Sequence, residues 1–131
     1  SILETDFIKI CQSIVSGTLS SVEVSFSKKA TVCKYVVPAG YPENPSKNFE
    51  VFCDPENKNL YLAAVQEKDG AIFATGSRTA AFVGTNKEVG VAEGLAELGV
   101  SEIGGDLFHR KDIGTGALIR GRINHMKEIL G

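Results

Sequence analysis

The sequence predicts an α+β fold in which an antiparallel sheet is flanked by helices. Residues 30–85 hold several short runs of β-branched and aromatic residues, and turn signals separate them. No helical segment lies between these runs, which favours hairpins over strand–helix alternation. Apolar residues recur at helical spacing before and after them. We therefore expect an antiparallel sheet of the half-barrel or hybrid-motif kind with an N-terminal lead-in helix.

Length and composition fit one domain with a modest core. The chain has 131 residues, of which 43% are hydrophobic and 23% charged. The formal charge of −2 argues against a general nucleic-acid binder, which would usually be basic. No apolar run approaches the ~20 residues that span a membrane, and no leader segment is evident, so we expect a cytoplasmic protein. The chain begins at Ser1 and its only methionine is Met126, which suggests a fragment, a processed product or a trimmed form of a longer protein.

The first 29 residues are expected to be a lead-in helix and a linker. One apolar stripe at helical period is formed by Leu3, Phe7, Ile10, Cys11 and Ile14. Gly17 is placed to end that helix. Residues 18–29 are polar and read as a linker with a short extended piece at 22–24. We predict that residues 1–29 lead in from a missing body and that residues 30–131 form the domain proper.

The sheet is predicted from five segments. Residues 30–37 form the first strand, and Pro38 stops it. Three of the four prolines lie in residues 38–45, so this loop is stiff, and Gly40-Tyr41-Pro42 is a suitable place for a substrate contact. Residues 48–53 are a short strand candidate. Residues 60–66 and 71–76 are expected to pair through Asp69-Gly70, and residues 79–85 form a further strand.

Two helices are predicted in the second half. Thr85 and Glu88 have capping-box spacing, so a helix is expected to run from there to Leu98, with Gly99 closing it. Gly90 and Gly94 suggest that this helix approaches the sheet closely. Residues 100–108 are expected to form a loop and a short strand. The last helix, residues 117–130, carries an apolar stripe of Ile119, Ile123, Met126 and Leu130.

The segment before the last helix offers the one plausible binding site. Arg110 supplies a planar fork suited to phosphate, and Lys111 supplies a point charge. A helix N-terminus also favours anions, so one interpretation is the edge of a phosphate-ester site. In the other interpretation, Asp112 or Thr115 caps the helix and the cations are solvated surface charges. The local pattern alone favours this second interpretation.

The sequence offers little support for a catalytic or metal-binding site. His109 and His125 are the only imidazoles, and no GxSxG elbow or phosphate-binding glycine motif is present. We therefore predict no catalytic and no metal-binding residues. The three cysteines form no CxxC pair and are expected to be buried free thiols: Cys11, Cys33 and Cys53.

Three motifs resemble the C-terminal part of the phosphoribosylamine–glycine ligase (glycinamide ribonucleotide synthetase) family. They are residues 30–42 with the Gly-Tyr-Pro loop, Gly76-Ser77-Arg78 with the strand and helix after it, and residues 110–114, Arg-Lys-Asp-Ile-Gly. They occur in the family's order and at compatible spacing, and the resemblance as a whole covers nearly the whole chain. Ser77 stands where many members have a second glycine. Residues 61–65 replace a Phe-His-Ala-Gly-Thr segment, as in a divergent, archaeal-type branch.

The resemblance implies a specific role. The complete enzyme is an ATP-grasp ligase of purine biosynthesis that joins glycine to 5-phosphoribosylamine. ATP and Mg (or Mn) would be bound by the missing upstream body, which would also be the partner of this chain. The fragment would close one side of the active-site cleft of the ligase, would bind no cofactor itself and would be inactive alone. The expected substrate-binding residues are Arg110, Lys111, Arg78, Gly40, Tyr41 and Pro42.

Two alternatives stay open at this point. One is the C-terminal domain of another ATP-grasp ligase or carboxylase, against which the combined Gly-Tyr-Pro and Arg-Lys-Asp-Ile-Gly motifs argue. The other is a free-standing, non-catalytic interaction domain.

Overall fold

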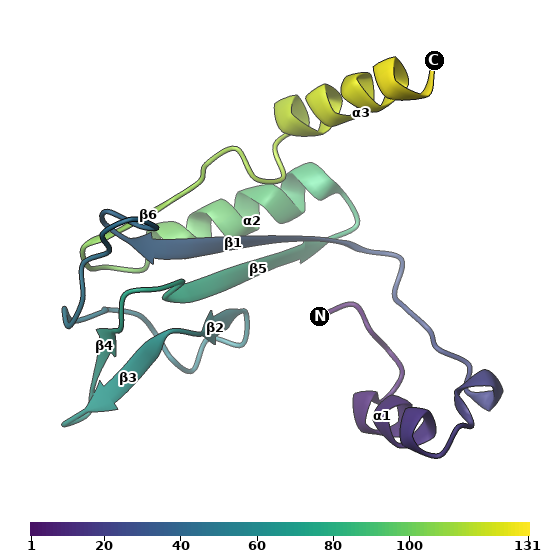
Figure 1. Ribbon diagram of the computed structural model, residues 1–131, viewed down its shortest axis with the longest axis horizontal. Helices are drawn as coiled ribbons and strands as arrows, with labels where there is room; N and C mark the ends of the chain where they lie inside the picture. Colours follow the sequence, from purple (N-terminus) through teal and green to yellow (C-terminus); the bar gives the residue numbers. More distant parts are fainter.

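The structure is a computed structural model that describes residues 1–131 (Figure 1). The helices are α1 (Phe7–Val15), α2 (Val89–Ser101) and α3 (Gly116–Leu130), with a 3₁₀ turn η1 (Leu19–Ser21). The strands are β1 (Ala30–Pro38), β2 (Leu60–Leu62), β3 (Val65–Lys68), β4 (Ala71–Ala74), β5 (Ala80–Asn86) and β6 (Leu107–His109). No helix is both long enough and apolar enough to cross a membrane. The predicted α+β class is confirmed.

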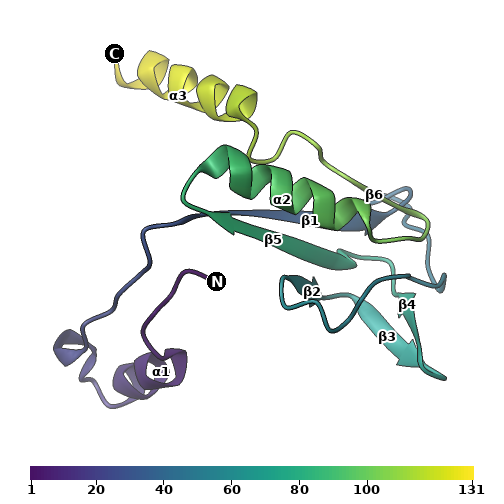
Figure 2. The ribbon, with the colours of Figure 1, turned by 180° about the vertical axis from the view of Figure 1, so that it is seen from behind.

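The main sheet has four antiparallel strands in the order β2-β5-β1-β6. Across it, Tyr35 of β1 faces Ala81 of β5, and Val37 faces Phe108 of β6. The strands β3 and β4 form a separate hairpin below the main sheet (Figure 2). Its turn carries Asp69 and Gly70 at φ +53° and +78°, which confirms the predicted Asp-Gly hairpin.

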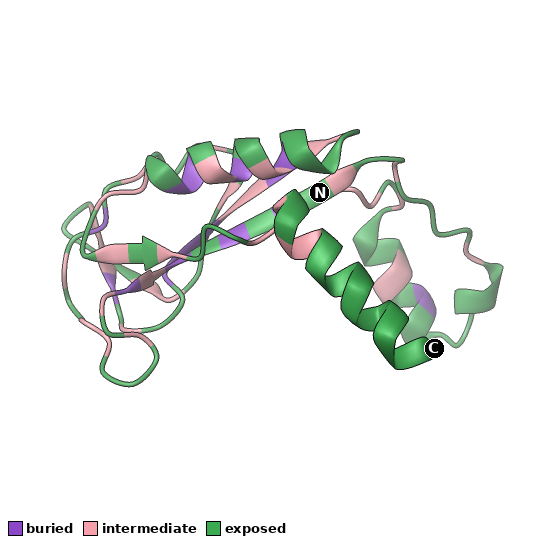
Figure 3. Ribbon diagram, turned by 90° about the horizontal axis from the view of Figure 1, so that it is seen from above, coloured by how far each residue is buried: buried purple, intermediate pink, exposed green.

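The main sheet has one covered face and one open face. Along β1, Val32, Lys34 and Val36 are buried, whereas Cys33 and Tyr35 are exposed. Because neighbouring side chains of a strand point to opposite faces, the buried set lies under α2. Figure 3 shows the buried positions of α2 turned toward the strands. The other face of β1 and β6 is therefore free to form a site.

Two glycines let α2 lie close to the sheet, and they are not the two that were predicted. A Cβ atom on Gly84 of β5 would overlap the carbonyl oxygen of Ala92, and one on Gly99 would overlap the ring of Phe82. A Cβ atom on Gly90 or Gly94 would meet no other atom within 4 Å, and both glycines face solvent. The prediction was wrong because helical spacing alone does not say which face a glycine occupies.

The ends of several elements differ from prediction. Thr85 does not cap α2, because β5 continues past it and pairs it with Thr31. Glu88 is the N-cap, and its N–H donates to the Asn86 side chain. Gly99 does not end α2, because the helix continues to Ser101. Its glycine is explained by packing instead: the absence of a side chain at Gly99 leaves room for the ring of Phe82.

The remaining differences concern short strands. Residues 48–53 form no strand and make only isolated bridges, Glu50 with Phe73 and Phe52 with Gly104. Residues 60–66 are split into β2 and β3, because the chain leaves the main sheet at residues 63–64 to enter the hairpin. The opening helix begins at Phe7, since Leu3 instead bridges Phe26.

The two terminal helices lie apart from the sheet, α1 at one end and α3 above α2 (Figure 1). Their apolar stripes are largely exposed: Phe7 is 64% exposed, Met126 50% and Leu130 77%. Thr115 caps α3 by accepting a hydrogen bond from the Leu118 N–H, which decides between the two predicted caps.

Candidate functional site

A cavity of about 600 Å³ opens on the free face of the sheet. It brings together parts of all three motifs, which lie far apart in the sequence. Its walls come from β1, the loop after it, the turn between β4 and β5, and β6 with the segment that follows it. The lining residues are Cys33, Tyr35, Val37, Tyr41, Pro42, Arg78, Phe108, Arg110 and Ile113.

Arg78 forms one cationic wall of the cavity. Its guanidinium lies 5.8 Å from the centroid of the Tyr35 ring, a cation–π distance. The side chain is exposed and makes no hydrogen bond or ion pair within the chain. Its N–H donors are therefore available to an anion, while the cation–π contact with Tyr35 holds the guanidinium over the ring.

Arg110 forms the second cationic wall and is held by Asp112. Its Nε donates to one carboxylate oxygen at 3.0 Å and its Nη2 to the other at 2.6 Å. The hydrogen bonds from Arg110 lower the pKa of Asp112 and raise the pKa of the guanidinium itself. Both side chains are well exposed, so the pair adds little stability and can exchange with an external anion.

The Gly-Tyr-Pro loop contributes shape to the cavity. Tyr41 is half-buried and Pro42 exposed, and both line the wall. Gly40 lies outside the lining and adopts φ +77°. A Cβ atom there would overlap the carbonyl oxygen of Asn44, whose N–H donates to the Gly40 carbonyl. Gly40 thus allows the tight turn that presents Tyr41.

Lys111 does not line the cavity, although it neighbours Arg110. Its side chain is exposed, and its carbonyl oxygen accepts a hydrogen bond from Lys34 at 2.9 Å. Of the six predicted binding residues, four meet in the cavity: Arg78, Arg110, Tyr41 and Pro42. Gly40 and Lys111 act on it only through the backbone.

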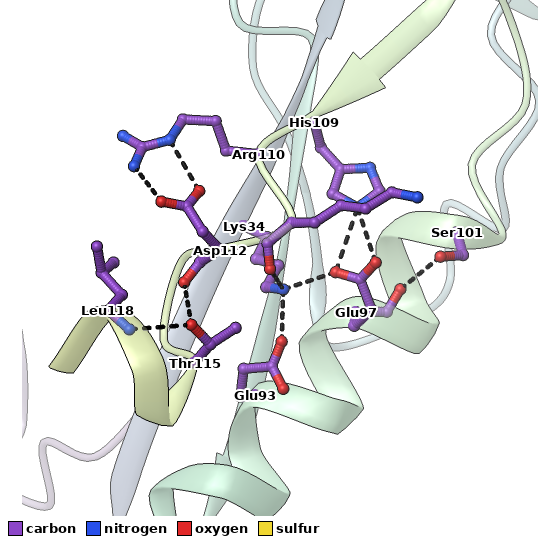
Figure 4. Close-up of polar contacts among 10 residues, drawn as sticks. Lys34, Glu93, Glu97, Ser101, His109, Arg110, Asp112, Thr115 and Leu118 are labelled. Atoms are coloured by element: carbon purple, nitrogen blue, oxygen red, sulfur yellow. Dashed lines mark hydrogen bonds and ion pairs between the residues drawn. The ribbon is translucent and has the colours of Figure 1, made fainter. Parts of the chain in front are cut away.

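A buried charged cluster on the opposite face went unpredicted (Figure 4). The Lys34 ammonium, with a side chain 0% exposed, lies 2.7 Å from Glu93 and 2.6 Å from Glu97. Glu97 also contacts the His109 ring at 3.1 Å. The sequence signal was a lysine on the buried side of a strand, matched by two glutamates four apart on one helix face.

The charges in this cluster stabilise one another. Burial lowers the pKa of Lys34, but hydrogen bonds and the charges of Glu93 and Glu97 outweigh it and raise that pKa overall. The hydrogen bond from Lys34, followed by that from His109, lowers the pKa of Glu97. Both groups therefore stay ionised at neutral pH.

These shifts predict how the stability of the chain depends on pH. Glu97 stabilises the fold above its unfolded pKa of about 4.3, and this contribution is lost as pH falls through its lowered folded pKa. Lys34 contributes below about pH 10.4 and loses its contribution only as pH rises through its raised pKa.

Urea unfolding should therefore show the free energy of unfolding of the chain falling between about pH 5 and pH 3, and this fall should be smaller in Glu97→Gln. Asp112→Asn is the control for an exposed pair, and parallel curves for Glu97→Gln and the unmodified chain would contradict this role of Glu97.

The cysteines are free but not all buried. Cys33 is exposed in the cavity wall, and Cys11 and Cys53 are half-buried. The expectation of buried thiols was wrong because Cys33 points to the open face of β1. Burial nevertheless raises the pKa of Cys33 and of Cys53, which keeps both in the thiol form at neutral pH.

No three His, Cys, Asp or Glu side chains gather as a metal-binding group. The carboxylates of Glu93 and Glu97 are both occupied by the ammonium of Lys34. The fold and the cavity thus define an α+β domain that presents two arginines and three aromatic rings on the open face of an antiparallel sheet.

Residues 31–116 match the family described as phosphoribosylglycinamide synthetase, C domain. The chain belongs to this family. The predicted resemblance is confirmed, and α2, the cavity and all of the sheet except its first residue, Ala30, fall within the matched residues.

Relatives and a solved structure agree with this assignment. The chain is 52% identical to phosphoribosylamine–glycine ligase of Methanosarcina barkeri over 132 residues, and 51% identical to that of Methanosarcina acetivorans over 131 residues. These matches cover 100% and 99% of this chain but 30% of each relative. The crystal structure of phosphoribosylamine–glycine ligase from Thermotoga maritima is similar at TM-score 0.55 and 28% identity, covering 60% of this chain and 20% of that one. The chain therefore spans under a third of the length of the curated relatives it matches.

Proposed function

We propose that this chain is the C-terminal domain of a phosphoribosylamine–glycine ligase and that its cavity holds the phosphate end of phosphoribosylamine. The observation that carries the proposal is the meeting of Arg78, Arg110 and the Gly-Tyr-Pro loop in one cavity. These residues come from three separate motifs, and each motif alone is weak. Relatives that bear the ligase name cover the whole chain, which supports the choice of substrate.

The two arginines divide the work of binding. Arg78 is stacked on Tyr35 and has its donors free, so it can bind phosphate oxygens directly. Arg110 is held ready by Asp112 in a two-point arrangement that a phosphate can imitate. The phosphate would replace the carboxylate without moving the guanidinium far. Tyr35, Tyr41 and Phe108 would cover the ribose and exclude water.

Neither magnesium nor ATP has a recognisable binding group in this chain. No three His, Cys, Asp or Glu side chains gather where they could hold a metal ion, and no phosphate-binding glycine motif occurs. We assign both, together with the chemistry that activates glycine, to the upstream part of the ligase. The 131-residue chain alone should then show no ligase activity and serve as one wall of the cleft in a cytoplasmic enzyme.

The uncovered surfaces fit this role as part of a larger body. Only 15 of the 131 residues are buried, and the terminal helices supply one of them, Ser13. We propose that the upstream part of the ligase covers the stripes of α1 and α3. In that arrangement, α1 is the link from the upstream part into β1.

The function is tested by replacing Arg110 in the full-length ligase. Arg110→Ala removes a charged two-point contact worth about 1.5–3 kcal/mol, so the apparent KM for phosphoribosylamine should rise about 10- to 100-fold. The KM for ATP should stay unchanged. Lys58→Ala, in an exposed turn, is the control and should leave all constants unaltered. An unchanged KM for phosphoribosylamine in Arg110→Ala would rule out the phosphate role.

A further inference from the structure

We propose that Lys34 is a positioning residue for Arg110, acting through the carbonyl of Lys111 from the far side of the sheet. The inference rests on the proposed function, because it assigns Lys34 a part in holding the phosphate-binding guanidinium. Lys34 lies on the α2 side of β1, whereas Arg110 lines the cavity on the open side. The two side chains do not meet, so any effect of Lys34 must pass through the backbone.

All three protons of the Lys34 ammonium have partners. Two go to Glu93 and Glu97, and the third goes to the Lys111 carbonyl at 2.9 Å. The two glutamates belong to α2, the most deeply packed helix of the fold. The ammonium therefore ties the segment after β6 to a rigid helix, because a bond from a buried cation to a carbonyl is strong.

The residues on both sides of Arg110 are held by the same cluster. Before it, the His109 ring contacts Glu97, at 3.1 and 3.2 Å from its two oxygens. After it, the Lys111 carbonyl accepts a hydrogen bond from Lys34. Figure 4 shows His109 turned toward α2 and Arg110 turned the opposite way, toward Asp112. Glu97 thus touches both supports, and Arg110 sits between two backbone positions that cannot move independently.

The next peptide is held too. The Asp112 carbonyl accepts from the Thr115 N–H at 3.1 Å and from its hydroxyl at 2.8 Å. Lys34 is the donor to the Lys111 carbonyl, so loss of this bond would leave the carbonyl, and the segment that carries Arg110, without its tie to α2. The turn could then rotate and carry Arg110 and Asp112 with it. A misplacement of about 1 Å can cost up to about 100-fold in an enzyme, so a modest tilt would be measurable.

The test uses the full-length ligase and a variant that removes the lysine together with both of its carboxylate partners, so that none of the three charges is left without its partner. Lys34→Met, Glu93→Met and Glu97→Met together replace the ion pairs with unbranched apolar side chains of similar length, which proteins often tolerate. None of the three can donate to the Lys111 carbonyl. Lys58→Met is the matched control at an exposed lysine. The KM for phosphoribosylamine and for ATP, the kcat and the melting temperature are measured for each, with and without Arg110→Ala.

We expect the triple variant to raise the KM for phosphoribosylamine about tenfold, with the KM for ATP and the melting temperature near those of the unmodified enzyme. In the Arg110→Ala background, the triple change should raise the KM for phosphoribosylamine by less than about twofold, because the residue that Lys34 positions is no longer there. A stable triple variant with an unchanged KM for phosphoribosylamine, or an equal rise in both backgrounds, would overturn the role of Lys34 and leave the proposed function intact.

If Arg110→Ala itself leaves the KM for phosphoribosylamine unchanged, the proposed function is overturned, and the positioning role of Lys34 with it. If the triple variant does not fold, the double variant Lys34→Met with Glu93→Met is measured by the same criteria, because it removes the donor and one charge of each sign and leaves Glu97 in contact with His109.

Discussion

Lys34→Met is expected to lower the free energy of unfolding of the chain by about 2–4 kcal/mol. Removing one member of a buried ion pair typically costs about 3–5 kcal/mol, because the partner charge is left uncompensated. Here two carboxylates lose their partner, but Glu93 and Glu97 keep 20% and 32% of their side chains exposed. Water can therefore solvate the two carboxylates in part, so the expected loss lies at or below the lower end of the usual range of about 3–5 kcal/mol. Urea unfolding at pH 7 measures it.

The control for this prediction removes the charges together. The triple methionine variant at positions 34, 93 and 97 has no uncompensated carboxylate, so it should recover most of the loss. His109 keeps 13% of its side chain exposed and can reach water. Equal stability of Lys34→Met and the unmodified chain would mean that the cluster contributes no net stability.

Gly84→Ala is expected to destabilise the chain by about 3 kcal/mol, at the upper end of the usual cost of overpacking. The added methyl group would overlap the Ala92 carbonyl oxygen and lie 2.8 Å from the Ala96 backbone nitrogen. Both are backbone atoms of α2, so no side chain can turn away to make room. The helix would have to lift from β5, opening the contact that also buries Val32. Chemical unfolding of the variant and of the unmodified chain measures this loss in the free energy of unfolding.

Gly94→Ala is the matched control for Gly84→Ala. Gly94 lies inside α2 on its exposed side, with nothing within 4 Å of the added Cβ position. Alanine there should stabilise the helix by about 0.5–1 kcal/mol, because it loses less backbone entropy on folding than glycine. If Gly84→Ala were as stable as Gly94→Ala, the close approach of α2 to β5 would be refuted.

The parts of the fold that depend on local pattern were predictable. The β-branched and aromatic residues within 30–37 predicted β1, and Asp69-Gly70 predicted the β3–β4 hairpin. Both signals act over a few residues, since strand propensity and turn chemistry are local properties. The same holds for the stripe of α3, although the structure leaves that stripe exposed.

The parts that depend on contacts between distant segments were not predictable. Thr85 and Glu88 satisfied the local rule for a capping box, but pairing of Thr85 with Thr31 outweighed it. Gly84 showed no local sign of its contact with α2. For the candidate site, the motifs named Arg78 and Arg110, but only the register of the sheet brings them to the same cavity. Lys34 was passed over because its partners lie 59 and 63 residues away.

The most direct test of the phosphate site is the affinity of the full-length ligase for glycinamide ribonucleotide, the product, measured by calorimetry. The product retains the phosphate that the two arginines would bind, and its binding requires no turnover. The Arg78→Met and Arg110→Met variants should each bind it about tenfold more weakly, and the double variant about 100-fold more weakly, whereas Lys58→Met should have the Kd of the unmodified enzyme. A double variant that binds the product as tightly as the unmodified enzyme would contradict a phosphate site in this cavity.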